Sequence, residues 1–219
     1  MRLFLLFAGF LIASSSLVEQ DYISFEFDGD DDFPYFLLID SIENPNNIWR
    51  IGEPVKEGFD EAYSLPNVIG TSLNSMVPTN NQSSFIVKTI DFDGFENTDI
   101  SHVLISGQYW VNSDSLNDYG IIEASFDQGD TWIDLLDDSI IDLYNLWYEK
   151  PILTGNSNGW QYFEMYLTEL GDHFQVDYLD TVLYRFSYVT DSIQDSLSGL
   201  MFDNLNFENW AECIHDQNT

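Results

Sequence analysis

Residues 103–111 read Val-Leu-Ile-Ser-Gly-Gln-Tyr-Trp-Val, and this stretch gives the clearest indication of the fold. Successive side chains of a β-strand point to opposite faces. One face would carry Val103, Ile105, Gly107, Tyr109 and Val111, and the opposite face His102, Ser106 and Gln108. The pattern therefore predicts a long strand with one face in a hydrophobic core.

Strand patterns recur along the whole chain, whereas helical periodicity is hard to find. Further strands are expected at residues 22–27, 48–51, 84–90, 120–126, 161–167, 183–189 and 200–207, which are rich in Val, Ile, Phe, Tyr and Trp. Many strands without intervening helices indicate a sandwich or a barrel. We predict an all-β, two-sheet antiparallel jelly-roll sandwich at residues 20–208, followed by a short polar tail at 209–219.

The first residues have the order of a secretory signal peptide. Met1 and Arg2 precede an apolar stretch at residues 3–12, and small residues follow at 13–16. A membrane-spanning helix needs roughly 20 apolar residues, and no later segment approaches that length. We therefore expect a signal peptide at about residues 1–19, cleaved between Ala13 and Gln20, and a secreted or cell-surface protein without a membrane span in its mature chain. An N-terminal anchor is the alternative.

The charge balance is strongly acidic. The chain has 38 Asp and Glu residues against 6 Lys and Arg, a net charge of −32. Its hydrophobic content of 44% and aromatic content of 16% nevertheless predict a folded protein. Such a negative field repels phosphate backbones and anionic lipids, so nucleic acid is not an expected partner. Most carboxylates are expected to solvate the surface, and divalent cations, basic partners and neutral ligands remain open.

Cys213 is the single cysteine of the chain. An internal disulfide is therefore impossible, and a zinc site or redox motif built from several cysteines is excluded. The core, with bound metal as a possible aid, must stabilise the exported protein.

Residues 125–132 read Ser-Phe-Asp-Gln-Gly-Asp-Thr-Trp and match the Asp-box hairpin found in sialidases. The motif positions are Ser125, Asp127, Gly129, Thr131 and Trp132. Its Ser and Asp side chains are expected to bond the backbone of the turn, its Gly to take a positive φ, and its Trp to pack beneath as a buried anchor. The motif occurs once, and Arg50 and Arg185 are too few for the arginine triad of a sialidase. It therefore predicts a structural hairpin.

Residues 155–159 read Gly-Asn-Ser-Asn-Gly and fit the pattern Gly-x-Ser-x-Gly of a nucleophile elbow. His173 and His215 lie downstream, where the base of a triad would stand. An elbow needs a helix after the serine, but residues 160–167 alternate as a strand. The sequence thus favours a polar turn over a catalytic Ser157, and the histidines lack the spacing of a helical zinc peptidase.

Glu26, Asp28 and Asp30 alternate along a predicted strand and its end. Two such carboxylates about 5 Å apart could serve as the acid and nucleophile of a retaining glycosidase. Clustered carboxylates beside a glycine turn suit an oxygen-liganded calcium ion better. Solvated surface charge is the third possibility.

Several segments together resemble the MAM-like, concanavalin-like jelly-roll modules of secreted bacterial surface proteins. These modules are attached to immune-inhibitor-type metallopeptidases and to sorting-domain proteins. The resemblance rests on residues 25–26, 49–52, 83–85, 118–132 and 199–205 in that order. It implies a calcium ion shared by Glu26 and Asp203, with Asp28 as a neighbour. The cysteines of the eukaryotic modules are absent, and residues 210–219, which follow Asn209 in this sequence, are too few for a sorting domain.

These observations favour a non-catalytic extracellular module for glycan or protein binding and adhesion, with a structural calcium ion. Exposed aromatic side chains would form the contact surface, because Trp and Tyr combine apolar area with a polar group. The candidates are Trp110, Trp147, Tyr148 and Trp160. The alternatives are a small secreted hydrolase, either a glycosidase using Glu26 and Asp28 or an esterase using Ser157, and a purely structural part of a surface assembly.

Overall fold

The computed structural model describes residues 18–29, 36–89, 98–139, 146–167 and 182–213. Twelve β-strands lie within these ranges. The first six are β1 (Val18–Phe25), β2 (Leu37–Leu38), β3 (Trp49–Gly52), β4 (Val68–Thr71), β5 (Gln82–Lys88) and β6 (Thr98–Asn112). The others are β7 (Tyr119–Ser125), β8 (Ile133–Asp134), β9 (Trp147–Glu149), β10 (Gln161–Tyr166), β11 (Leu183–Val189) and β12 (Gly199–Cys213).

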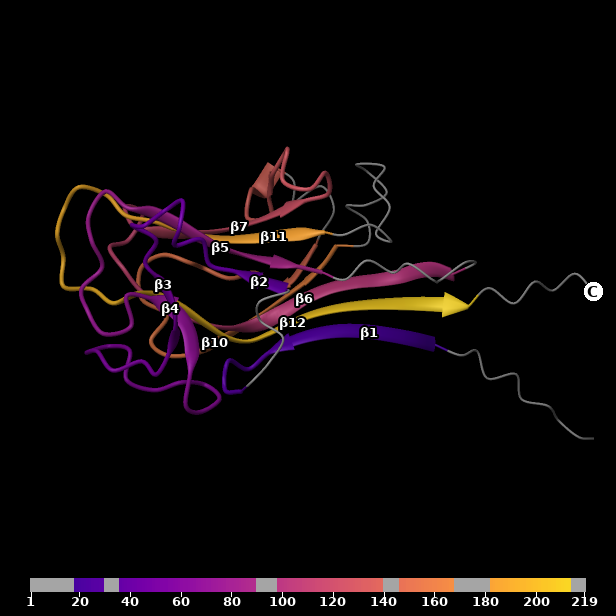
Figure 1. Ribbon diagram of the computed structural model, residues 1–219, viewed down its shortest axis with the longest axis horizontal. Helices are drawn as coiled ribbons and strands as arrows, with labels where there is room; N and C mark the ends of the chain where they lie inside the picture. The colour runs from indigo at the N-terminus through magenta and orange to yellow at the C-terminus, as the bar shows by residue number, and fades with distance from the viewer. Residues whose placement is uncertain (1–17, 30–35, 90–97, 140–145, 168–181, 214–219) are drawn as a thin grey trace, which may run out of the picture.

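The strands form two antiparallel sheets that pack face to face (Figure 1). Sheet A has the order β3-β4-β12-β6-β10-β9, with β1 also paired to β12. Sheet B has the order β2-β5-β11-β7-β8. Across both sheets the pairs are nested, since β4 pairs with β12, β5 with β11, β6 with β10 and β7 with β8. An antiparallel ribbon paired in this way and wrapped into two sheets is a jelly roll, so the predicted fold class is confirmed.

Aromatic side chains from both sheets fill the space between them. Trp49 and Phe202 come from sheet A and Phe85 and Phe186 from sheet B, and all four are fully buried. The rings of Phe85 and Phe186 stack with centroids 4.8 Å apart, and Trp49 meets Phe85 edge-on at 4.8 Å. Burial alternates along β5 with the period of two that a half-buried strand requires.

Gly107 explains an interruption in the apolar face of β6. A Cβ atom at this position would lie 2.7 Å from Leu205 and 3.0 Å from Phe163. The glycine therefore leaves room for two large core side chains, while its neighbours Ile105 and Tyr109 are buried as the alternation predicts.

Residues 53–67, which connect β3 to β4, fold over the outer face of sheet A, away from sheet B (Figure 1). We call this segment the cover loop. Its Phe59 and Ala62 pack against Val68, Leu73 and Met201 in a second, smaller hydrophobic cluster. The cover loop thus buries part of the outer face of sheet A. Side chains of this face that lie outside the area covered by the loop remain exposed.

The strand pairing extends beyond the boundaries expected for the sandwich. β12 continues to Cys213; residues 209–212 pair with β1, and residues 209–213 pair with β6. This backbone pairing runs five residues past the end predicted for the sandwich at residue 208. β1 begins at Val18, within the range expected for the signal peptide, and residues 1–17 lie outside the described part. No helix among the described residues is long and apolar enough to cross a membrane.

Candidate functional site

Aromatic side chains gather on the outer face of sheet A, beside the cover loop. Along β10, Phe163 and Met165 are buried in the core, so Tyr162, Glu164 and Tyr166 point outward. Tyr162 is 44% exposed and Tyr166 40% exposed. Tyr162 lies opposite Gln108 of β6, and Trp110 is the next outward residue of that strand. We define the aromatic face as Tyr63, Trp110, Tyr148, Trp160, Tyr162 and Tyr166.

Trp160 fixes one end of the aromatic face. Its ring meets Trp110 at 5.9 Å and Tyr63 at 6.0 Å between centroids, both edge-on at 72°. Its indole Nε1 donates a hydrogen bond to the carbonyl of Glu61, 3.2 Å away. Trp110 in turn packs against Phe59 of the cover loop. These contacts hold both tryptophans half-buried and leave Tyr63, 52% exposed, as the ring most open to solvent at this end.

Glu164 provides a hydrogen-bonding group between two tyrosines of the face. The Tyr162 hydroxyl donates to its carboxylate. Burial, followed by this hydrogen bond, raises the pKa of Tyr162 to about 12. The pKa of Tyr166 is also raised, chiefly by a hydrogen bond to Glu164. Both phenols therefore stay protonated at neutral pH, and the face combines neutral rings with a carboxylate that can accept hydrogen bonds.

Two of the predicted ligand-contact residues lie in different environments. Tyr148 on β9 is 72% exposed, as a contact residue should be. Trp147 points inward, where its Nε1 donates to the carbonyl of Leu135 at 2.8 Å and its ring packs on Phe163. Trp147 is therefore partly buried against the core and does not lie among the exposed rings. The register shift between Glu164 and Met165, opposite β9, sets this orientation.

The hairpin motif at residues 125–132 joins β7 to β8 through a hydrogen-bonded turn. Asp127 accepts hydrogen bonds from the Thr131 backbone N–H at 2.8 Å, from the Thr131 hydroxyl at 2.6 Å and from the Ser125 hydroxyl at 2.8 Å. Ser125 Oγ also accepts from the N–H of Gly129, whose φ is 96°. These bonds lower the pKa of Asp127, with the Thr131 hydroxyl contributing most.

Trp132 differs from the buried anchor expected in this hairpin. It is only half-buried, and the guanidinium of Arg185 lies over its ring, 4.0 Å from the centroid. Arg185 also forms a two-point ion pair with Glu123 at 2.6 and 2.7 Å. The Trp side chain therefore covers an ion pair on the outside of sheet B, because the hairpin lies at the edge of that sheet and not over the core.

Asp203, expected as a calcium ligand, anchors the cover loop. Its buried carboxylate accepts hydrogen bonds from the Ser64 N–H at 2.7 Å, the Ser64 hydroxyl at 3.0 Å and the Asn204 N–H at 2.8 Å. Burial raises its pKa to about 6, and the charge of Asp28 adds to this. Ser64 lies 139 residues away in sequence, so no local pattern could have indicated the contact.

The other two proposed ligands lie near the same end of β1. Asp28 accepts a hydrogen bond from the Asn67 N–H at 2.8 Å, and Glu26 is exposed. The side-chain oxygen of Asn204 is buried without a hydrogen-bond partner. Within the described ranges, no three Asp, Glu, His or Cys side chains converge on a point that could hold a metal ion.

Ser157, the serine of the Gly-x-Ser-x-Gly match, ties its turn to β6. Its hydroxyl accepts a hydrogen bond from the Val111 N–H at 3.1 Å and donates to the carbonyl of Gly159 at 2.7 Å. His173 and His215, the histidines considered as the base of a catalytic triad, lie outside the described residues. Asp30 of the predicted carboxylate cluster also lies outside them.

Sequence reasoning did not single out Tyr63, Tyr162 and Tyr166 as surface residues. The alternation Tyr162-x-Glu164-x-Tyr166, opposite in phase to the buried Phe163 and Met165, could have identified two of them. Tyr63 carries no such signal, because its position depends on how the cover loop packs.

No family model matches the sequence, and no curated protein matches it. Among solved structures, the chain is similar to the K2 cleaved adhesin domain of Lys-gingipain. The match covers 86% of this chain and 99% of that chain, with 10% sequence identity and a TM-score of 0.47. A likeness at this level identifies neither a ligand nor the role of any residue.

Proposed function

We propose that this chain is a non-catalytic extracellular module that binds a glycan chain through the aromatic face. The observation that carries the proposal is the row of partly exposed rings on the outer face of sheet A, with Glu164 between two of them. Aromatic rings offer flat apolar area for the C–H faces of sugar rings, and the carboxylate offers an acceptor for their hydroxyls. A protein partner is the alternative ligand, and export rests on the pattern of residues 1–16.

The rigidity of the face supports binding. Trp160 is fixed by two ring contacts and one hydrogen bond, so little side-chain freedom is lost when a ligand packs against it. Binding surfaces that are ordered in advance avoid part of the entropic cost of association. An uncharged glycan also avoids the repulsion that a net charge of −32 exerts on anionic partners.

The proposed function is tested by glycan-array screening of the secreted chain, followed by calorimetric titration of each hit. Tyr63→Ala should weaken binding at least tenfold, equivalent to about 1.4 kcal/mol, because it removes the most exposed ring beside Trp160. Tyr119→Ala is the matched control, since Tyr119 is 40% exposed on β7 of the other sheet. Equal affinities of both variants and wild type would exclude the aromatic face as the binding surface. Turnover of a polysaccharide or ester by the wild-type chain would support the hydrolase alternative.

We further propose that a structural calcium ion binds at the end of β1, with Asp28 and Asp203 as ligands and Glu26 as a more exposed neighbour. Calcium takes carboxylate and amide oxygens, and the unpartnered oxygen of Asn204 supports the choice of this location. The charge of Asp28 raises the pKa of Asp203, which indicates that the two carboxylates repel each other without a cation.

The melting temperature should therefore rise with calcium more than with magnesium at equal ionic strength. A hundredfold excess of ion over its dissociation constant corresponds to about 2.7 kcal/mol of added stability. Asp28→Asn should remove the difference between the two ions. Asp28 is the better test position, because a change at Asp203 also breaks the contact with Ser64. Equal shifts with both ions would reduce the effect to general charge screening.

A further inference from the structure

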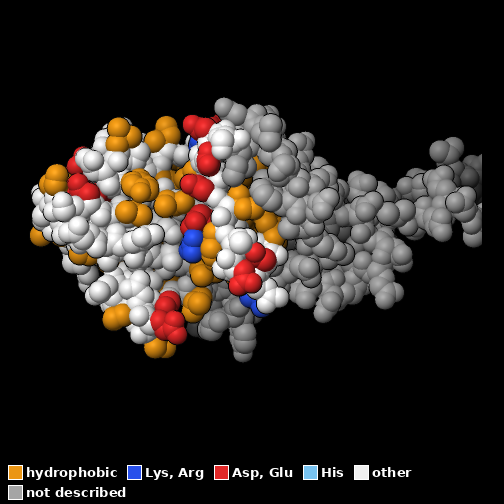
Figure 2. All heavy atoms as spheres, turned by 90° about the horizontal axis from the view of Figure 1, so that it is seen from above, with side chains coloured by type: hydrophobic (Ala, Val, Ile, Leu, Met, Phe, Trp, Pro, Cys, Tyr) orange, Lys and Arg blue, Asp and Glu red, His pale blue; other side chains and the backbone are white. Residues whose placement is uncertain are grey.

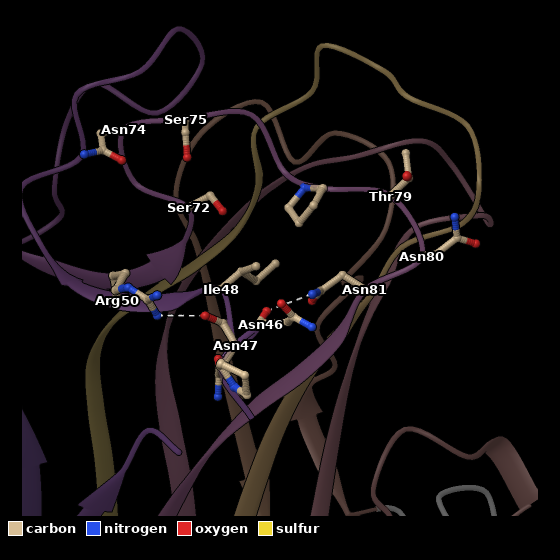
Figure 3. A pocket seen from close by; sticks show the side chains of 12 residues that line it. Asn46, Asn47, Ile48, Arg50, Ser72, Asn74, Ser75, Thr79, Asn80 and Asn81 are labelled. Carbon is tan, nitrogen blue, oxygen red and sulfur yellow. Dashed lines mark hydrogen bonds between the residues drawn. The ribbon is translucent and has the colours of Figure 1, made fainter. Parts of the chain in front are cut away.

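A pocket of about 540 Å³ lies between residues 45–50 and residues 72–81 (Figure 3). Its volume falls in the range of small-molecule sites, roughly 300–1,000 Å³. The first segment leads into β3, and the second connects β4 to β5. The pocket shares no residue with the aromatic face.

Two buried asparagines form the base of the pocket. Asn47 donates through Nδ2 to the carbonyls of Asp40 at 3.0 Å and Ser84 at 2.7 Å. Asn81 donates to the carbonyl of Asn46 at 2.9 Å and accepts from the Ser83 hydroxyl. These bonds tie both segments to each other and to β5, so the base is formed without a ligand.

Lys56 of the cover loop holds one wall in place. Its ammonium donates to the carbonyls of Thr71 at 2.8 Å, Ser72 at 2.9 Å and Ser75 at 3.4 Å. Burial lowers its pKa to about 8, which leaves it largely charged at neutral pH. The Ser72 N–H also donates to the carbonyl of Ile48 at 2.8 Å and thereby joins the two walls.

The rim of the pocket presents polar side chains that are available to a ligand. Asn46, Asn74, Ser75, Thr79 and Asn80 line it, as Figure 3 shows for both walls. Their side chains make no hydrogen bond within the part of the chain that the structure describes. Arg50 uses only Nη1, which donates to the carbonyls of Asn47 and Trp49.

The pocket lining contains no carboxylate, although 38 of the 219 residues are Asp or Glu. Figure 2 shows the face above sheet B, where acidic side chains gather near the middle and mostly uncharged side chains cover the end opposite the grey residues. A pocket without carboxylates offers a cation no charged group with which to pair. An anion would meet one guanidinium and the long-range repulsion of a chain with net charge −32.

Amide and hydroxyl groups match the chemistry of a sugar. Each sugar hydroxyl donates one hydrogen bond and accepts others, and an asparagine amide likewise donates and accepts. Ile48, Pro45 and Pro78 add apolar contacts for the ring carbons. We propose that this pocket binds an uncharged saccharide unit and is a ligand site separate from the aromatic face.

Nuclear magnetic resonance of the ¹⁵N-labelled chain tests this proposal, because the side-chain amides of Asn46, Asn74 and Asn80 report directly on the rim. The probes are the methyl glycosides of glucose, galactose, mannose and N-acetylglucosamine, with galacturonate as the charged counterpart. At least one neutral probe at millimolar concentration should produce saturable shifts of these amides. The double variant Asn74→Ala/Thr79→Val should weaken that binding at least tenfold while keeping the wild-type melting temperature.

Two controls separate this site from the aromatic face. Asn158→Gly removes an exposed amide at a positive-φ turn that is not part of the pocket and should leave probe binding unchanged. Tyr63→Ala should also leave it unchanged, although it weakens glycan binding at the aromatic face. The proposal is wrong if no neutral probe shifts the rim amides, if the double variant binds as wild type does, or if galacturonate binds more tightly than every neutral probe.

Discussion

Asp203 shows how a single buried carboxylate can hold a long loop in place. Its oxygens receive both the backbone N–H and the hydroxyl of Ser64, and these bonds fasten the cover loop to β12. Hydrogen bonds to a charged acceptor are stronger than those between neutral groups. Burial nevertheless disfavours the charged form, and for this reason the pKa of Asp203 rises to about 6.

The raised pKa predicts a pH dependence of stability. The pKa of Asp203 in the folded protein lies above the ordinary value of 3.8, so proton binding by Asp203 stabilises the folded state. This contribution is complete below pH 3.8 and is lost as the pH rises through about 6. The free energy of unfolding should therefore increase as the pH falls from 7 toward 4, measured by urea denaturation. This increase should be smaller in Asp203→Asn than in wild type.

Asp60→Asn provides the control, because Asp60 is exposed on the same cover loop. This variant reports the gain in the free energy of unfolding that comes from lowering the net negative charge alone. If the Asp203 and Asp60 variants showed the same dependence on pH, the buried carboxylate would not be its source.

The β7–β8 hairpin is stabilised as an element by one acidic side chain. Asp127→Ala removes the acceptor for three hydrogen bonds and leaves the Thr131 N–H without its partner. We expect a lower melting temperature and faster hydrogen exchange at the Thr131 amide. Asp130→Ala, an exposed acidic residue of the same turn, should change neither quantity. Unchanged exchange in the Asp127 variant would show that the turn does not depend on this carboxylate.

At the scale of elements, the sequence predicted those strands whose two faces differ in environment. β5 and β10 alternate in burial, because one side of each meets the core. The cover loop could not be predicted, since its position depends on the contact between Ser64 and Asp203. The orientation of Trp147 depends on a register shift opposite β9, which composition does not reveal. The sequence therefore predicted that aromatic residues form the candidate surface, and it identified Trp110, Tyr148 and Trp160. It did not predict how far the surface extends.

At the scale of the whole molecule, the net charge and the interactions that hold the fold together are largely separate. The carboxylates limit the classes of partner, but the fold rests on apolar packing between the sheets and on the cluster beneath the cover loop. The pocket beside β3 and β5 had no indication in the sequence, because asparagines and serines in loops are typical of ordinary turns. These side chains form a candidate site only because residues 45–50 and residues 72–81 lie next to each other in the fold.

The position of β12 has a consequence for how the protein folds. This strand comes last among those described, yet it lies inside sheet A between β6 on one edge and β4 and β1 on the other. Until residues 199–213 are synthesised, β4 and β6 have open edges that could pair with other chains. Completion of sheet A therefore waits for residues 199–213, and the many distant strand pairings predict a slow folding rate.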